Sequence, residues 1–309
     1  SVYNNNKVEF LNLSSHIVFK EDWNDISCSK LWLYNLHYFD DLNAIGSQER
    51  VRLHQHFLDK WIDENPVGEG TGWEAYPISL RVVNWIKWSI RNKSLTQKHL
   101  TSLVLQVRWL YSNLEYHLLA NHLWANAKAL LFAGIFFCGP EAKKWYSKGL
   151  SILTSELVEQ CLADGGHFER SPMYHSIFLD DIIDILYLAN RYVALFEVEW
   201  IFTLEMSANS MLSWLYKMSH PDNAIPFFND STFGIATPLK TLISDYNNIV
   251  QYAPKFERFN RSSTLLSNSG FCRLSNDNIT CLCDVGSVSP NYIPGHAHAD
   301  TLSFELSLF

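Results

Sequence analysis

Residues 164–175 read Asp-Gly-Gly-His-Phe-Glu-Arg-Ser-Pro-Met-Tyr-His and lie between two long segments with helical periodicity. Gly165 and Gly166 permit backbone conformations that are closed to other residues. Ser171 followed by Pro172 is typical of a helix start, because serine caps the first turn and proline fits within it. The stretch therefore predicts a tight loop between two helices, with the second helix beginning just after the proline.

The same stretch is dense in side chains that move protons or hold charge. His167, Glu169, Arg170, Tyr174 and His175 lie within nine positions of one another. A loop that presents a tyrosine and a histidine at a helix start favours a catalytic or binding role. An interhelical turn with polar surface residues explains the pattern equally well, and the stretch alone does not choose between the two interpretations.

Apolar residues recur with helical spacing on both sides of this loop, and the connections between the periodic segments are short. The helical ranges are 48–63, 78–91, 96–119, 121–137, 141–163, 174–196 and 198–219. No strand is expected between Leu31 and Ser219. Antiparallel helical hairpins in such a series predict a bundle, a solenoid or a toroid. The lack of a fixed-period repeat argues against a standard solenoid.

The pattern changes after about Pro221. One more helix is expected over 237–252, and from Ser269 the apolar residues recur at every second position, as in strands. The expected strands are 270–274, 279–285 and 301–309. A hairpin and one further strand cannot form a sheet with a core of its own. We therefore expect a helical domain followed by a β domain that begins near Ser269 and is incomplete at Phe309.

The composition excludes some classes of protein. With 309 residues, of which 47% are apolar, the chain has enough apolar side chains to form a sizeable core. A formal net charge of −8 provides no overall basic field for nucleic acid, and no run of apolar residues is long enough to predict a membrane span. The 11 Trp, 14 Tyr and 19 Phe either fill the core or stack on sugar rings. The six scattered cysteines favour free, mostly buried thiols in a reducing compartment.

A polar group opens one otherwise apolar helix. Asn121 and His122 are followed by Asn126 and Lys128. His122 and Asn126 are four residues apart and share a helix face, and polar groups buried without partners destabilise a fold. A helix N-cap would account for Asn121, with His122 as a half-buried residue, but it leaves Asn126 unexplained.

A second polar group precedes the last expected strand, where Pro-Gly-His-Ala-His-Ala-Asp places His296, His298 and Asp300 at alternate positions. In an extended chain these three side chains face the same side. They predict a partial metal site or a catalytic cluster, and a complete zinc site needs ligands from elsewhere. A merely polar entry to the strand is the weaker interpretation, because the two histidines and the aspartate would need partners.

One aromatic segment near the start of the chain is a candidate wall of a carbohydrate groove. Trp32–Asp41 mixes aromatic and polar residues, and a packed N-terminal segment is the alternative. The glycine-rich segment Gly68–Pro77 carries Trp73, Glu74 and Tyr76. It lacks the lysine and the helix context of a phosphate-binding loop, so that interpretation is rejected.

Three stretches together resemble the heparinase II/III family of polysaccharide lyases. They are Asn-His-Leu-x-Ala-Asn-x-Lys-Ala-Leu from Asn121, Gly-Gly-His-Phe-Glu-Arg-Ser-Pro-Met-Tyr-His from Gly165, and Gly-His-Ala-His-Ala-Asp-x-Leu-Ser-Phe from Gly295. Their order and spacing also match, and residues 32–88 resemble members found in bacterial surface-polysaccharide gene clusters. The resemblance implies a mainly α fold, with an incomplete, alginate-lyase-like (α/α) toroid over residues 1–265 and the beginning of an antiparallel β-sandwich domain over residues 266–309.

The resemblance also implies β-elimination on an anionic polysaccharide that contains uronic acid. It assigns Asn121, aided by His122, to neutralising the C5 carboxylate, and it assigns Tyr174 and His296 to the transfer of protons. His298 would ligate a structural divalent metal, zinc or calcium, with its other ligands beyond residue 309. Further contacts with the substrate are expected at His175, Arg170, Glu169, Trp73 and Asn126.

Two other functions stay open. A uronate C5-epimerase of the same fold would also remove the C5 proton but would return one to that carbon. A non-catalytic protein of polysaccharide binding or assembly would bind glycan without turnover. A glycoside hydrolase is less favoured, because Asp180 and Asp181 lie in one helix and point two ways, so they do not form an acid/base pair. The sequence leaves the polysaccharide, the oligomeric state and the compartment, cytoplasm or periplasm, open.

Overall fold

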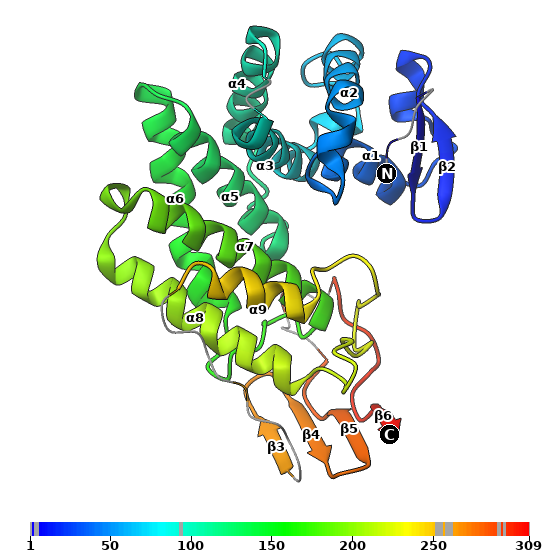
Figure 1. Cartoon of the computed structure of the whole chain (residues 1–309), viewed down its shortest axis with the longest axis vertical. Coiled ribbons are helices and arrows are strands. Elements are labelled where there is room, and N and C mark those ends of the chain that lie inside the picture. Colours follow the sequence, from blue (N-terminus) through cyan, green and yellow to red (C-terminus); the bar gives the residue numbers. More distant parts are fainter. Residues whose placement is uncertain are drawn as a thin grey trace. The chain divides into compact units, whose positions relative to one another are not determined.

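The fold was analysed in a computed structural model, shown in Figure 1. The structure describes Val2, residues 6–92 and 95–250, Phe256, residues 262–288, Tyr292 and residues 295–308. The chain divides into two compact units, Ser1–Leu153 and Thr154–Phe309, and each is described by itself. The division falls within helix α6 (Pro140–Gln160).

The first unit contains a short β-hairpin and a series of helices. Its elements are β1 (Lys7–Phe10), β2 (Leu13–His16), α1 (Lys30–Tyr38), α2 (Val51–Glu64), α3 (Ala75–Asn92), α4 (Gln97–Ser112), α5 (Ala120–Phe136) and the first part of α6. Helix α3 lies at the centre and packs against α1, α4 and α5. Gly134 and Gly149 let α5 and α6 approach closely, since a Cβ atom on Gly134 would lie 2.5 Å from the backbone nitrogen of Tyr146.

The core of this unit is built from aromatic rings around one buried cation. Arg81 is fully buried, and it donates hydrogen bonds to Gln106 Oε1 at 2.8 Å and to the carbonyl oxygens of His37 and Gly72. Its guanidinium carbon also lies 3.9 Å from the centre of the Trp61 ring. Nine of the 11 tryptophans of the chain are buried, so for most of them packing in the core is confirmed.

Two helix boundaries in this unit differ from the sequence prediction. The helix expected over 96–119 ends at Ser112, where the side chain of Asn113 bonds to the carbonyl of Trp109 at 2.8 Å. Residues 113–119 then form a loop. Helix α5 begins at Ala120 with Leu119 as its N-cap, so the expectation that Asn121 caps the helix is wrong. Leu119 and Ala120 have φ angles of 59° and 49°, which strain residues that carry a Cβ atom.

The second unit contains three further helices and a four-stranded sheet. They are α7 (Pro172–Arg191), α8 (Val198–Lys217), α9 (Leu239–Asn247), β3 (Ser262–Leu266), β4 (Phe271–Ser275), β5 (Ile279–Asp284) and β6 (Phe304–Leu308). Helix α9 packs across α7 and α8 (Figure 1). The strands pair in the order β3-β4-β5-β6, and every pair is antiparallel.

The helix start predicted near Pro172 is confirmed, since the Oγ atom of Ser171 accepts a hydrogen bond from the backbone of Tyr174 and the proline occupies the first turn. Gly165 has a φ angle of 87°, and a Cβ atom there would lie 2.3 Å from the carbonyl oxygen of Ser210. This position requires glycine because the loop turns sharply while it lies directly against α8.

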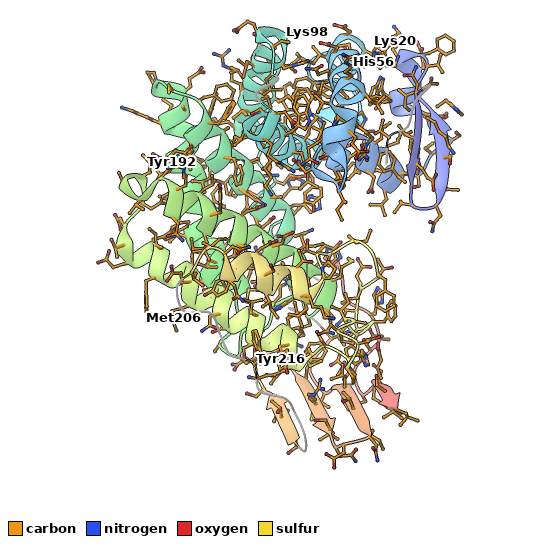
Figure 2. The ribbon with its side chains drawn as sticks, in the orientation of Figure 1. Lys20, His56, Lys98, Tyr192, Met206 and Tyr216 are labelled. Carbon is orange, nitrogen blue, oxygen red and sulfur yellow. The ribbon has the colours of Figure 1, made fainter. Side chains whose placement is uncertain are left out.

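Helix α8 shows why these segments form helices that pack on one side. Its buried residues recur with helical spacing, and the opposite face carries exposed side chains such as Met206, which Figure 2 labels together with Tyr192 at the end of α7. None of the helices in the described residues has the length and apolar character that a membrane crossing requires. The buried residues of α8 are Leu204, Ala208, Met211, Leu212, Trp214 and Leu215.

The change from helices to an antiparallel sheet is confirmed in the described residues. Strand β3 and the N-terminal hairpin were not predicted, and β6 begins later than expected because Leu302 adopts a φ angle of 71° in a turn. Strand β3 straddles the boundary expected after residue 265, and that boundary stays a prediction. Parts of the ranges expected for the last helix (237–252) and the last strand (301–309) lie outside the described residues. All six cysteines are free as expected, but they are half-buried or exposed and not mostly buried.

Candidate active site

A tyrosine and a histidine from separate segments meet in the second unit. The rings of Tyr174 and His296 have centroids 3.9 Å apart and planes inclined by 36°. Atom Nδ1 of His296 lies 2.8 Å from Oδ2 of Asp230, and its Nε2 lies 3.7 Å from Oε2 of Glu169. We call these four residues the Tyr174 cluster. They come from the start of α7, the loop that precedes it, the connection between α8 and α9, and the loop before β6.

The two carboxylates indicate which ring nitrogen of His296 carries a proton. An ionised carboxylate only accepts hydrogen bonds, so we assign a proton to Nδ1 of His296, where it is donated to Asp230. The other ring nitrogen, Nε2, is then the atom that exchanges a proton. Glu169 is 1% exposed, and its carboxylate faces this nitrogen.

Tyr174 is held in its protonated form. Burial raises the pKa of Tyr174 above its ordinary value, and the negative charges of Asp230 and Glu169 raise it further. At neutral pH the phenol therefore carries its proton and is suited to donating it. Removing that proton requires the carboxylate charges to be offset, for example by protonation of His296.

Hydrogen bonds between side chains and backbone join the loops around this cluster. Ser171 Oγ donates to the carbonyl of Asp230 at 2.9 Å. Asn229 donates from Nδ2 to the carbonyl of Arg170 at 2.9 Å and accepts a bond from the backbone N–H of His298 at 3.1 Å. Arg170 and Asn229 have φ angles of 58° and 54°. Strained backbone of this kind persists where surrounding contacts fix it, and it is common near functional sites.

A second tyrosine and histidine meet in the first unit. The rings of Tyr76 and His122 have centroids 4.4 Å apart and planes inclined by 33°. Atom Nδ1 of His122 lies 3.2 Å from Oε1 of Glu115, which is an ion-pair distance when the imidazole is protonated, although the N–H is not aligned as in a hydrogen bond. We call Tyr76, His122 and Glu115 the His122 cluster. Asn121 precedes His122 in the first turn of α5 and is half-buried.

Asn126 is the polar residue that the sequence left unexplained. It is fully buried. Its Oδ1 accepts the backbone N–H of Glu115 at 2.9 Å, and its Nδ2 donates to Oε2 of Glu115 at 2.9 Å and to Oγ of Ser79 at 3.0 Å. The amide therefore ties the loop 113–119 to α3 and α5. This corrects the expected substrate contact of Asn126 to a structural role, because its side chain has no exposed surface.

His175 also requires a correction. It is fully buried, its Nε2 lies 3.0 Å from the carbonyl oxygen of Met211, and its ring stacks on Trp214 with centroids 4.4 Å apart. Burial lowers the pKa of His175 to about 3, so the ring is neutral. The side chain packs in the core of the second unit, and its burial excludes the predicted substrate contact.

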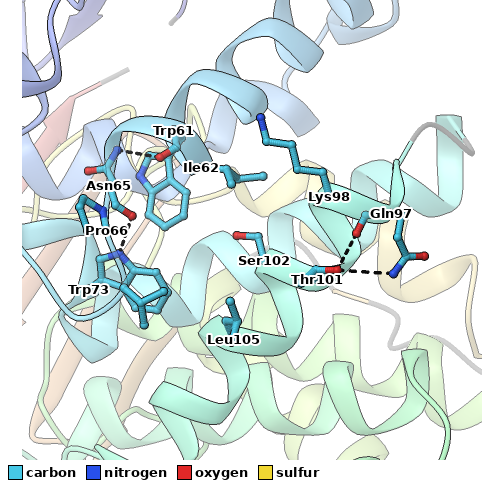
Figure 3. Close-up of a pocket in the computed structure, with 11 residues that line it drawn as sticks. Trp61, Ile62, Asn65, Pro66, Trp73, Gln97, Lys98, Thr101, Ser102 and Leu105 are labelled. Carbon is cyan, nitrogen blue, oxygen red and sulfur yellow. Dashed lines mark hydrogen bonds between the residues drawn. The ribbon is translucent and has the colours of Figure 1, made fainter.

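Trp73 lines a hollow of about 410 Å³ in the first unit, formed by the end of α2, the loop that follows it and the start of α4 (Figure 3). Its indole is 4% exposed and donates a hydrogen bond to the carbonyl of Asn65 at 3.2 Å. The residues that line this hollow do not include Tyr76 or His122. A contact of Trp73 with a polysaccharide stays a prediction, separate from the His122 cluster.

The expected metal site is not formed by the residues described. Residues 295–300 form turns and bends instead of a strand, so His296, His298 and Asp300 do not alternate along one face. Asp300 accepts the backbone N–H of Asn229, and His298 is exposed. Within the described ranges, no three His, Cys, Asp or Glu side chains are grouped to hold a metal ion. A metal held by His298 with ligands beyond residue 309 stays a prediction, and no chemical step is assigned to a metal.

The remaining predicted contacts have partners of their own. Arg170 is half-buried and donates to the carbonyl of Ser287 in the loop that follows β5. Its contact with a substrate stays a prediction. Asp230, Glu115 and Tyr76 belong to the two clusters but were not proposed as site residues. The sequence signal for Asp230 was the polar end of the run Phe-Phe-Asn-Asp-Ser, and Tyr76 followed the singled-out Trp73 and Glu74.

The order of elements, helical hairpins followed by an antiparallel sheet, defines a mainly helical class of protein with a β region at its end. Residues 40–260 match the family described as heparinase II/III N-terminus, and residues 259–308 match the one described as heparinase II/III-like, C-terminal. The chain therefore belongs to the heparinase II/III family, and the resemblance stated from its motifs is confirmed.

Two curated relatives have sequences similar to this chain. A heparin-sulfate lyase of Pedobacter heparinus is 28% identical over 204 residues, which cover 61% of this chain and 30% of the relative. A heparin-sulfate lyase of Bacteroides stercoris is 31% identical over 140 residues, covering 44% and 20%. The chain thus matches about a third or less of the length of these two relatives.

Solved structures confirm the fold class. The crystal structure of heparinase III aligns with a TM-score of 0.66 and 20% identity, covering 93% of this chain and 49% of that one. The crystal structure of a heparan sulfate lyase from Pedobacter heparinus aligns with a TM-score of 0.59 and 21% identity, covering 98% and 52%. The fold is therefore an incomplete (α/α) toroid of helical hairpins followed by the start of an antiparallel β-sandwich domain.

Proposed function

We propose that the protein is a polysaccharide lyase that cleaves a polysaccharide containing uronic acid by β-elimination. The observation that carries the proposal is the Tyr174 cluster, in which a protonated phenol lies against an imidazole that is oriented by a carboxylate. Its setting supports the proposal, because the chain belongs to the heparinase II/III family and its curated relatives are named heparin-sulfate lyases.

The reaction sets three chemical requirements. The negative charge of the C5 carboxylate has to be neutralised so that the C5 proton becomes acidic, a base has to remove that proton, and an acid has to protonate the leaving oxygen at C4. We assign the first task to Asn121 and His122. The other two fall to Tyr174 and His296.

The state of Tyr174 suggests how the proton transfers are divided. Because the pKa of Tyr174 is raised, the phenol is a proton donor in the resting protein. We therefore assign Tyr174 to protonation of the leaving oxygen and His296, through Nε2, to removal of the C5 proton. Both side chains return to their resting states when the imidazolium of His296 gives its proton to the phenolate of Tyr174. The 3.9 Å separation of the two rings favours this transfer.

The proposal is tested with full-length protein and a panel of uronic-acid polysaccharides of heparan, alginate and other bacterial surface types. The unsaturated uronate product is followed by its near-ultraviolet absorbance. Tyr174→Phe should reduce its formation by at least about 1,000-fold, because a positioned proton donor contributes on the order of 10² to 10⁴. Tyr192→Phe is the matched control, since this exposed tyrosine at the end of α7 belongs to neither cluster.

Three results would contradict the proposal. Undiminished activity in Tyr174→Phe would remove this residue from the mechanism. Incorporation of solvent deuterium at C5 without cleavage, measured by NMR in heavy water, would favour the epimerase instead. Binding of glycan with neither reaction would favour a non-catalytic protein of polysaccharide binding or assembly.

A further inference from the structure

Glu115 places a negative charge in the protein interior, where burying a charge costs free energy. The residue is 8% exposed and lies in the loop 113–119. A carboxylate at this depth requires hydrogen bonds and a counter-charge, since an unpaired buried charge is strongly destabilising. Atom Nδ2 of Asn126 donates a hydrogen bond to Oε2 of the carboxylate, and Oδ1 of Asn126 accepts the backbone N–H of Glu115. The amide carries no charge, so these bonds meet only the first requirement.

His122 lies where a counter-charge for Glu115 is needed. Oxygen Oε1 of Glu115 lies 3.2 Å from Nδ1 of this histidine, and the two oxygens of the carboxylate are thus divided between Asn126 and His122. Asn126 and His122 are four residues apart on α5 and share one helix face. The helix therefore holds the carboxylate with one residue and presents the imidazole to it with the other.

We infer that Glu115 is a positioning residue that keeps His122 protonated and fixes its ring, so that the imidazolium beside Asn121 offers a positive charge to the carboxylate of a uronate. The inference rests on the proposed function for its role in catalysis, and it deepens that function by defining the charge state of the carboxylate-binding group. Asn126 acts one step further away, because it holds Glu115.

The other groups around this histidine are consistent with a single fixed cation. Tyr76 from α3 packs on the imidazole, and it brings no charge at neutral pH. Tyr34 from α1 lies beyond it, with the two tyrosine rings 6.5 Å apart, and donates its hydroxyl hydrogen to Glu74. Glu74 is in turn paired with Lys30 at 2.9 Å, so its charge is offset locally.

A protonated His122 affects the elimination in one particular step. When the C5–H bond breaks, the proton passes to the base and the electron pair is delocalised into the carboxylate of the uronate. That group then carries more negative charge than in the bound substrate, so a fixed cation stabilises the transition state more than the ground state. His122 gives up no proton in this step. Loss of its charge should therefore lower kcat more than it raises KM.

The test is Glu115→Gln, which keeps the size of the side chain and an oxygen for Asn126 but removes the charge. The pKa of His122, followed by NMR of its ring Cε1–H, should fall by about one unit or more, since an opposite charge at this distance stabilises the imidazolium. With full-length protein, kcat should fall about tenfold with KM changed less than threefold. Glu141→Gln is the matched control, because this exposed carboxylate pairs with Arg108 and belongs to neither cluster.

Glu115→Asp is the conservative variant and keeps the charge, so it should retain most of the pKa of His122 and most of kcat. It also serves if thermal unfolding shows that Glu115→Gln does not fold. An unchanged pKa of His122 in folded Glu115→Gln overturns the inference whatever the activity. If the wild-type protein forms no unsaturated product but the pKa still falls, the proposed function and the catalytic role fail, and the positioning of His122 by Glu115 stands.

Discussion

The two compact units each bring together a tyrosine and a histidine, but the carboxylate next to Nδ1 of the histidine differs in exposure. In the His122 cluster the ring centroids are 4.4 Å apart, and the side chain of Glu115, 10% exposed, is held by Asn126. In the Tyr174 cluster the centroids are 3.9 Å apart, and the side chain of Asp230, the partner of Nδ1, is 47% exposed, whereas Glu169 near Nε2 is buried. A buried carboxylate with fixed partners favours a constant charge on its histidine. A carboxylate open to solvent favours a histidine that changes its protonation.

This difference fits the division of labour proposed for the reaction. Neutralising a sugar carboxylate requires a cation that does not lose its proton during turnover, whereas acid and base catalysis requires groups that exchange protons in every cycle. The same three residue types can serve both purposes, and the burial of the carboxylate decides which one. Substitutions in the His122 cluster and in the Tyr174 cluster should therefore differ in their effects on kcat.

Among substitutions of the carboxylates in the two clusters, the largest effect is expected from Asp230→Asn. The amide keeps the size of the side chain but no longer fixes which nitrogen of His296 carries the proton, because an asparagine can both donate and accept. We expect kcat to fall about 100-fold, within the range for misplacing a general acid or base. The loss should exceed that of Glu115→Gln, because it affects proton transfer itself and not a supporting charge. Steady-state kinetics of the near-ultraviolet product measures both variants.

Asp222→Asn provides the control for this comparison. Asp222 lies in the same connection between α8 and α9, is exposed and accepts a hydrogen bond from the backbone of Ala224. It should retain kcat within about twofold, as expected for a surface substitution away from the cluster. Equal losses in Asp230→Asn and Glu115→Gln would contradict the distinction between an exchanging and a fixed histidine.

A smaller effect is expected on the stability of the first unit, in which Asn126 holds the carboxylate of Glu115. Asn126→Ala removes three hydrogen bonds of a fully buried amide and leaves the backbone N–H of Glu115 without its acceptor. We expect the free energy of unfolding to fall by about 2–3 kcal/mol. Asn113→Ala, in the same loop, removes one exposed bond to the carbonyl of Trp109 and should cost less than about 1 kcal/mol. Urea unfolding of both variants measures the difference, and equal losses would mean that Asn126 does not hold the loop.

The sequence was sufficient for the helices α2 to α8, for strands β4 and β5 and for the family, because these depend on patterns that are local. Helical spacing located the helices of the toroid, Ser171 and Pro172 marked the start of α7, and alternation located β4 and β5. The three motifs were specific in combination, and the match of residues 40–260 to the heparinase II/III family confirms them.

The loop 113–119 shows where local patterns fail. Leu114, Leu118 and Leu119 continue the apolar spacing of the preceding helix, so the sequence predicted a helix through Leu119. The chain leaves the helix because Asn126, far along the next helix, binds Glu115 through its side chain and backbone. The hydrogen bonds of Asp230 and Glu115 are likewise made to residues that no spacing rule connects to them. Burial removed His175 from the predicted contacts for the same reason, since its partners lie on α8.

The smallest predicted effect is an acid sensitivity that the two units should share. Burial lowers the pKa of both His37, in the first unit, and His175, in the second, to about 3, and the neighbouring Arg81 contributes to the shift of His37. An unfolded chain binds a proton at each histidine below about pH 6.5, whereas the folded protein does not until about pH 3. The stability that these neutral rings provide is therefore complete above pH 6.5 and falls as the pH decreases towards 3. At pH 5.5 each histidine should cost about 1.4 kcal/mol.

Hydrogen exchange monitored by mass spectrometry separates the two units in this measurement. Peptides from α1 and α7 report the opening free energy around His37 and His175, after correction for the intrinsic pH dependence of exchange. Both should lose stability between pH 7.5 and 5.5, and neither should change between pH 7.5 and 8.5, where the two rings are neutral in folded and unfolded chains alike. Loss confined to α7 would show that His37 is protonated in the folded first unit. That result would restrict neutral, buried histidines to the unit that carries the Tyr174 cluster.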